Sequence, residues 1–129
     1  MGGPWTVHGA DWAIVTKHAD WYPQPLEVMQ ARSLARVFFV AKLGGAKPGD
    51  RESNEIQRIL SHWKDFKLQA IGLTKNGHFV IHLNFLRNYD YSWDRNELIE
   101  VDDGGWNFWT INIDLGRFEA ADLEINGYV

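Results

Sequence analysis

The sequence contains no cysteine among its 129 residues. Disulfide bonds, thiolate metal sites and catalysis by a thiol are therefore excluded. The chain also lacks any window of ~20 apolar residues, the length that spans a bilayer. Its first residues lack the basic start and apolar core of a signal peptide. These absences predict a protein without membrane association, and we expect it in the cytoplasm.

The motifs of several common enzyme classes are missing as well. No serine stands in a Gly-x-Ser-x-Gly elbow, and Gly44-Gly45 is not followed by the Gly-Lys-Ser/Thr of a phosphate-binding loop. The many aspartates after residue 88 mark no single pair for glycoside hydrolysis. We therefore assign no catalytic residue and no cofactor.

Positive charge is scarce in the C-terminal third. Residues 88–129 carry ten acidic and two basic side chains, a net charge of −8, against −4 for the whole chain. Nucleic-acid binders instead present clustered Lys and Arg. We expect no nucleic-acid partner, whereas a basic protein would suit this acidic third.

Apolar and aromatic residues are plentiful, at 45% and 14% of the chain, with seven Trp and seven Phe. A disordered chain is much less apolar, and this length suits one domain with one core. We predict a single domain over residues 1–129. Within it, 1–50 form an N-terminal strand and helix region, and 51–129 form a helix followed by an antiparallel meander.

The N-terminal region begins with a predicted strand over residues 11–17, which are β-branched and bounded by polar residues. Pro25 is suited to open a helix running to about Ala35. The run 36–42 fits either a continuation of that helix or a buried strand, because periodicity alone does not distinguish them. We favour helix followed by strand.

Residues 53–66 have the clearest helical pattern. Asp50 or Ser53 can cap the helix by accepting a hydrogen bond from a free amide of its first turn. The apolar stripe that we expect to pack on the sheet recurs at helical spacing, at Ile56, Ile59, Leu60 and Trp63.

A hairpin is predicted around Asn76-Gly77, the preferred pair for a two-residue type I′ turn. This turn fixes the register of the flanking runs 68–74 and 79–86. One face then pairs small residues with bulky ones, including Ala70 with Leu83 and Gly72 with Ile81. The opposite face is half polar and resembles a pocket floor, with the pairs Leu73–Val80, Ile71–His82 and Gln69–Asn84.

The C-terminal part predicts a polar-aromatic loop over 88–96 and short strands over 98–101, 106–115 and 118–126. A tight turn or bulge is expected at 102–105 and a further bulge at Ala120-Ala121. The resulting fold class is α+β, an antiparallel β-meander packed against one main α-helix.

Several of these residues also form a recognisable series. Gln69-Ala70-Ile71-Gly72 precedes the Asn-Gly turn, and Val101-Asp102-Asp103-Gly104-Gly105 is followed by Trp106-Asn107-Phe108-Trp109, Asp114, Phe118, Leu123 and Asn126-Gly127. This series resembles a family of uncharacterised bacterial proteins over about residues 55–129. The resemblance implies the meander and supplies no activity. The architecture is similar to a cystatin-like or NTF2-like roll, by analogy only.

The candidate ligand-binding residues are Gln69, Ile71, His82 and Asn84 on the half-polar hairpin face, together with Trp93. Convergent polar groups on an apolar surface are typical of a ligand site. Trp93 stands in the polar-aromatic loop and is the best candidate for an exposed aromatic side chain that stacks on a ligand. A metal site at His8, Asp11, His18 and Asp20 is disfavoured, because their spacing matches no common metal-binding pattern.

Three functions remain open. The favoured one is a small-ligand-binding domain without catalysis, whose pocket for a small polar ligand lies between sheet and helix or on the face carrying Gln69, His82 and Asn84. The second is an acidic interaction module of the immunity or inhibitor type with a basic protein partner. The third is a small hydrolase-like enzyme in which His82 acts as general base beside a carboxylate. A homodimer through a sheet face is a further alternative.

Overall fold

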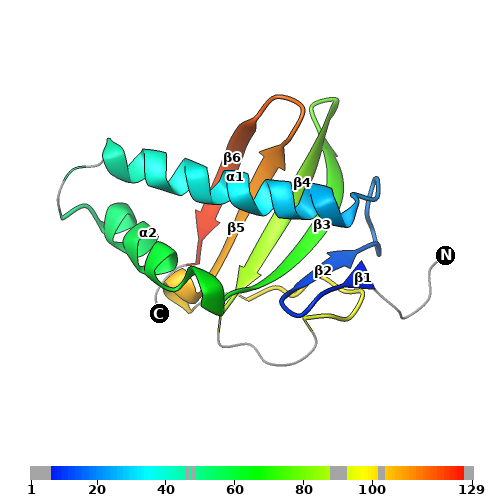
Figure 1. The fold of residues 1–129 in the computed structure, drawn as a ribbon, viewed down its shortest axis with the longest axis horizontal. Coiled ribbons are helices and arrows are strands. Elements are labelled where there is room, and N and C mark those ends of the chain that lie inside the picture. The colour runs from blue at the N-terminus through cyan, green and yellow to red at the C-terminus, as the bar shows by residue number, and fades with distance from the viewer. Residues whose placement is uncertain (1–6, 46, 48, 88–92, 102–103, 127–129) are drawn as a thin grey trace.

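The computed structural model describes residues 7–45, 47, 49–87, 93–101 and 104–126. These residues form a six-stranded sheet in the order β1-β2-β3-β4-β5-β6 with helices packed against it (Figure 1). Only β2 and β3 run parallel, since a long helical crossover joins them, and the other neighbours are antiparallel. The predicted α+β class is confirmed. The elements are β1 Val7–His8, β2 Trp12–Val15, α1 Pro25–Gly44, α2 Arg51–Ser61, the 3-10 helix η1 Trp63–Asp65, β3 Lys67–Lys75, β4 His78–Leu86, the 3-10 helix η2 Gly105–Asn107, β5 Phe108–Asp114 and β6 Glu119–Ile125.

The main helix, α1, lies across β4, β5 and β6 on one face of the sheet (Figure 1). It begins at Pro25, whose missing amide costs nothing at the first helical position. Glu27 accepts a hydrogen bond from the Gln24 amide at 2.8 Å and so closes the first turn. The buried stripe that faces the sheet recurs every three or four residues, at Val28, Ala31, Ala35 and Phe39.

The predicted strand at 36–42 is wrong, because α1 continues through it to Gly44. Phe39 is fully buried, whereas Val37 and Val40 are 62% and 58% exposed. The run is therefore apolar on both sides of the helix although only one side meets the core. Exposed valines concealed the helical period.

The second helix, α2, begins where Asp50 Oδ2 accepts a hydrogen bond from the Ser53 amide at 3.2 Å, so Asp50 is the cap. The predicted 53–66 helix is shorter than expected, ending at Ser61, and η1 follows it. Ile56 and Ile59 enter the core as predicted. We expected the 53–66 helix to be the main helix that packs on the sheet, and this expectation is wrong. The helix α1 crosses the strands, whereas α2 lies beside α1 and η2 (Figure 1).

The β3–β4 hairpin has the predicted register. Asn76 and Gly77 adopt φ angles of 52° and 80°, the two left-handed positions of a type I′ turn. Their geometry fixes every pair of the ladder, including Gly72–Ile81, Ala70–Leu83, Ile71–His82 and Gln69–Asn84.

An aromatic core fills the space between the helices and the inner face of the sheet. Trp109 of β5 stacks on Phe85 of β4, with ring centroids 3.8 Å apart and an interplanar angle of 5°. Phe39 from α1 and Trp63 from η1 flank Trp109 at 4.7 and 5.9 Å. Because side chains alternate along a strand, Gln69, His82 and Asn84 lie on the opposite, outer face.

Residues Leu98–Val101, predicted as a strand, join no ladder in the described part of the chain. Trp106 belongs to η2 rather than to the strand that follows it. The predicted turn at Asp102-Asp103 and the loop residues 88–92 lie outside the described residues.

The bulge in β6 lies two residues later than predicted. Asn112 pairs with Ala121 and Thr110 with Glu124, so Ile111 faces both Asp122 and Leu123. Asp122 adopts a φ of 57°, the left-handed conformation that residues in bulges often adopt.

Candidate functional site

The segment 93–101 lies against the outer face of the sheet, and Gln69 holds it there. The fully buried Gln69 amide donates from Nε2 to the carbonyls of Trp93 and Glu97, at 2.9 and 2.8 Å. Its Oε1 accepts from the Ile99 amide at 2.8 Å and from Asn84 Nδ2 at 3.1 Å. The segment 93–101 is thus held to the sheet by hydrogen bonds between the side-chain amides of Gln69 and Asn84 and its backbone, and not by the backbone–backbone bonds of a strand.

Trp93 is only 8% exposed, which corrects its assignment as an exposed stacking residue. It packs in a small cluster with Ala13 and Leu86, beside Phe108. The aromatic ring therefore serves packing on the outer face.

The sheet-face pocket lies between the outer face of β4, β5 and β6 and the segment 98–101. Its volume is about 230 Å³. Leu86 and Phe108 provide apolar surface, and Asn126 closes one side by donating to the Val101 carbonyl. Three adjacent strands contribute the polar side chains of His82, Asn84, Thr110 and Glu124 to its wall, and the segment 98–101 adds the carboxylate of Glu100.

His82 belongs to a chain of three polar side chains across the outer face. Asn112 Nδ2 donates to Asp122 Oδ2 at 2.9 Å, so its Oδ1 faces His82 Nδ1 at 2.7 Å. An amide oxygen only accepts, and His82 Nδ1 therefore carries the proton. The bond orients the ring and leaves Nε2 as its second hydrogen-bonding atom.

The structure brings two of the five predicted site residues to this pocket, His82 and Asn84. Gln69 and Ile71 are buried beside it and do not line it. Thr110 and Glu124 were missed because their placement depends on the pairing of β4 with β5 and of β5 with β6. No short turn links β4 to β5, so no local signal sets that register.

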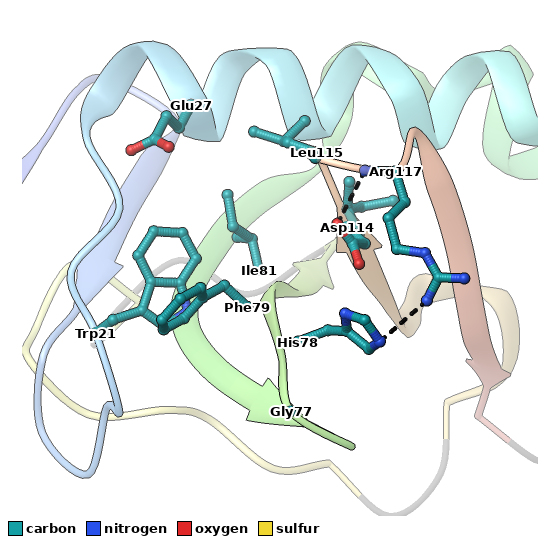
Figure 2. Close-up of a pocket in the computed structure, with 11 residues that line it drawn as sticks. Trp21, Glu27, Gly77, His78, Phe79, Ile81, Asp114, Leu115 and Arg117 are labelled. Carbon is teal, nitrogen blue, oxygen red and sulfur yellow. Dashed lines mark hydrogen bonds between the residues drawn. The ribbon is translucent and has the colours of Figure 1, made fainter.

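A second and larger cavity, the hairpin-tip pocket, lies between the start of α1 and the turns of the β3–β4 and β5–β6 hairpins (Figure 2). Its volume is about 610 Å³. Sequence reasoning missed it, since three segments distant in sequence form it.

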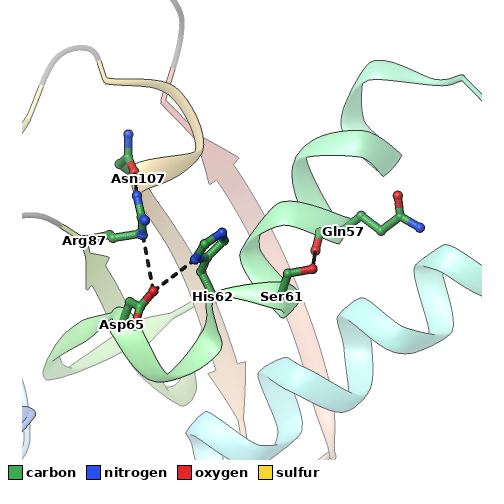
Figure 3. Close-up of polar contacts among 6 residues, drawn as sticks. All are labelled: Gln57, Ser61, His62, Asp65, Arg87 and Asn107. Atoms are coloured by element: carbon green, nitrogen blue, oxygen red, sulfur yellow. Dashed lines mark hydrogen bonds and ion pairs between the residues drawn. The ribbon is translucent and has the colours of Figure 1, made fainter.

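A polar cluster joins η1 to the end of β4 and to η2 (Figure 3). Asp65 Oδ2 lies 3.0 Å from His62 Nδ1 and 3.7 Å from Arg87 Nε, and Arg87 also donates to Asn107 Oδ1 at 2.8 Å. Ser61, the adjacent hydroxyl, donates to the Gln57 carbonyl of its own helix rather than to the imidazole. The cluster fastens chain segments together and does not form a nucleophile–base pair.

The structure separates the histidines and aspartates considered for a metal. Asp11 pairs with Arg32 at 3.3 Å, and Asp20 accepts from the amide and hydroxyl of Thr74. Within the described residues, no three His, Cys, Asp or Glu side chains are grouped as metal ligands. In the same part of the chain, no helix has the length and apolarity to cross a membrane.

Comparison with known proteins adds no relative. No protein-family model, curated protein or solved structure matches this chain.

Proposed function

We propose that this protein binds a small polar ligand in the sheet-face pocket, without catalysis. The supporting observation is the convergence of polar groups around an apolar floor, the usual composition of a ligand site. Five groups in the wall enter no hydrogen bond or ion pair within the described residues: His82 Nε2, Asn84 Oδ1, Thr110 Oγ1 and the carboxylates of Glu100 and Glu124.

These groups favour a ligand that donates hydrogen bonds. A carboxylate and an amide oxygen only accept, and the hydroxyl of Thr110 can accept as well as donate. Polyols and primary amines supply several donors in a small volume. Leu86 and Phe108 offer apolar surface to their C–H groups.

The surroundings of His82 favour binding over general-base catalysis. A catalytic imidazole is usually oriented by a carboxylate, which stabilises its protonated form. Here the amide of Asn112 stands between His82 and Asp122. An amide orients the ring equally well but carries no charge to stabilise an imidazolium.

The test is a thermal-shift screen of small polyols, primary amines and carboxylates on the full chain. We expect donor-rich compounds to raise the melting temperature, since a ligand at 100 times its Kd adds ~2.7 kcal/mol. His82→Gln and Glu124→Gln should fold normally and lose that shift. Glu119→Gln is the matched control, because Glu119 lies on the same strand outside the pocket. The proposal fails if no compound stabilises the protein or if both pocket variants respond like the control.

A further inference from the structure

The hairpin-tip pocket has a rigid aromatic wall. The Trp21 indole N–H donates to the carbonyls of Leu73 and Val80, at 2.9 and 3.1 Å. The Trp21 backbone packs directly against Gly72, where an added Cβ would lie 2.3 Å from the Trp21 carbonyl oxygen. The indole is therefore fixed before any ligand arrives, which lowers the entropy cost of binding.

Phe79 extends this wall toward solvent. Its ring lies 5.7 Å from the Trp21 ring in an edge-to-face arrangement, yet the residue is 65% exposed. Core packing does not account for an aromatic side chain left this accessible. Leu115 adds apolar surface to the lining (Figure 2). The buried core residues Ile81 and Ile113 also border the cavity.

The opposite wall carries a cation. Arg117 Nη1 lies 3.2 Å from His78 Nε2, and because a guanidinium only donates, the imidazole nitrogen is the acceptor. Arg117 also approaches Glu119 at 3.6 Å, with both side chains more than half exposed, so this ion pair is weak. The guanidinium is more than half exposed and faces His78 at the side of the pocket, so an anion can still reach it (Figure 2).

Two carboxylates also line the pocket, and one oxygen of each accepts a hydrogen bond from a backbone amide. Glu27 accepts from the Gln24 amide at the start of α1, where the helix dipole offsets its charge. Asp114 accepts from the Arg117 amide at 3.1 Å within the β5–β6 turn. Each carboxylate shapes the wall and lacks a cationic partner within the described residues.

The β5–β6 turn itself is strained. Phe118 adopts a φ of 52° and is 79% exposed, an uncommon conformation for a bulky residue. Strain of this kind concentrates at ligand sites, where it fixes a neighbouring group. Here the neighbouring group is Arg117.

We propose that the hairpin-tip pocket binds a hydrophobic carboxylate, with its apolar body on Trp21 and Phe79 and its carboxylate on Arg117. The bidentate geometry of guanidinium and carboxylate supplies the orientation. This site is separate from the sheet-face pocket and does not depend on the function proposed there.

The test compares three probes of one size, 4-phenylbutyrate, 4-phenylbutan-1-ol and 4-phenylbutylamine, by isothermal titration calorimetry on the full chain. We expect the acid to bind at least tenfold more tightly than the alcohol and the amine. Arg117→Gln should abolish this preference, whereas Arg58→Gln, an exposed arginine on α2, should preserve it. Phe79→Ala should weaken the binding of all three probes, and because Phe79 is 65% exposed, its truncation should leave the fold intact.

Three results would overturn the proposal. One is equal affinity for the acid and the alcohol, another is unchanged acid binding by Arg117→Gln, and the third is no binding of any probe at millimolar concentration. His82→Gln should leave acid binding unchanged, so the outcome here is independent of the outcome at the sheet-face pocket.

Discussion

Replacing Gln69 with leucine would detach the segment 93–101 from the sheet. The two side chains have similar size, so the substitution removes hydrogen bonds and leaves little empty space. Gln69 makes four such bonds, to the carbonyls of Trp93 and Glu97, the Ile99 amide and the Asn84 side chain. All four disappear together.

The loss of stability in Gln69→Leu depends on whether the four former partners of Gln69 find new hydrogen bonds. A hydrogen bond contributes ~1 kcal/mol net, so four give ~4 kcal/mol, and any partner that stayed buried without replacement would cost ~1–3 kcal/mol. The carbonyls of Trp93 and Glu97 lie in a segment at the protein surface and regain water if it lifts away. We therefore expect Gln69→Leu to lower the free energy of unfolding by ~2–4 kcal/mol, a large share of a typical 5–15 kcal/mol.

Urea denaturation measures the loss, and hydrogen exchange locates it. The Ile99 amide should exchange much faster in Gln69→Leu, while the Ile81 amide in the ladder of β4 should change only with global stability. Gln57→Leu is the matched control, since Gln57 is exposed on α2. A loss below ~1 kcal/mol with Ile99 still protected would refute the role given to Gln69.

Three further predictions concern the stability of the fold that carries the two pockets. Gly72→Ala should destabilise by ~1–3 kcal/mol, because the added Cβ meets the Trp21 carbonyl at 2.3 Å, and an unchanged thermal melt would contradict this close contact. Ala70→Leu should cost a similar ~1–3 kcal/mol by overpacking the fully buried inner face, again checked by denaturation. Asp50→Ala should cost ~1 kcal/mol, since the Ser53 amide loses its cap, whereas Asp50→Asn should recover most of that stability.

The hairpin was predictable to the residue because its determinant is local. Asn76 and Gly77 both occupy left-handed conformations, which select a two-residue turn and thereby align the strands. The faces of Gln69, His82 and Asn84 follow from that register alone.

The long helix was less predictable because its apolar residues form two groups, one buried against the sheet and one exposed to solvent. Ala31, Ala35 and Phe39 recur every four residues and carry the correct signal. Val37 and Val40 are apolar without being buried, and they add a second stripe that imitates a strand. The recurrence of Ala31, Ala35 and Phe39 every four residues alone predicts a helix that continues through the run 36–42.

The two pockets were predictable only in part because each depends on pairing between distant segments. The hairpin placed His82 and Asn84 on one face, but the β5 pairing supplies Asn112 and Thr110, and the β6 bulge aligns Asp122. None of these contacts leaves a local pattern in the sequence.

One strand, β4, contributes side chains to both pockets, and their alternation separates the two linings except at the hairpin tip, where His78 also joins the hairpin-tip pocket. His82, Asn84 and Leu86 of β4 face the sheet-face pocket, whereas Phe79 and Ile81 line the hairpin-tip pocket. A substitution on one face of β4 removes atoms from one pocket. It leaves intact the backbone hydrogen bonds that hold the strand in place for the other pocket. Distant sites without shared partners have additive effects. The stability cost of His82→Gln combined with Phe79→Ala should therefore equal the summed single costs within ~0.5 kcal/mol, and a larger coupling in denaturation would show that the two faces of β4 are not independent.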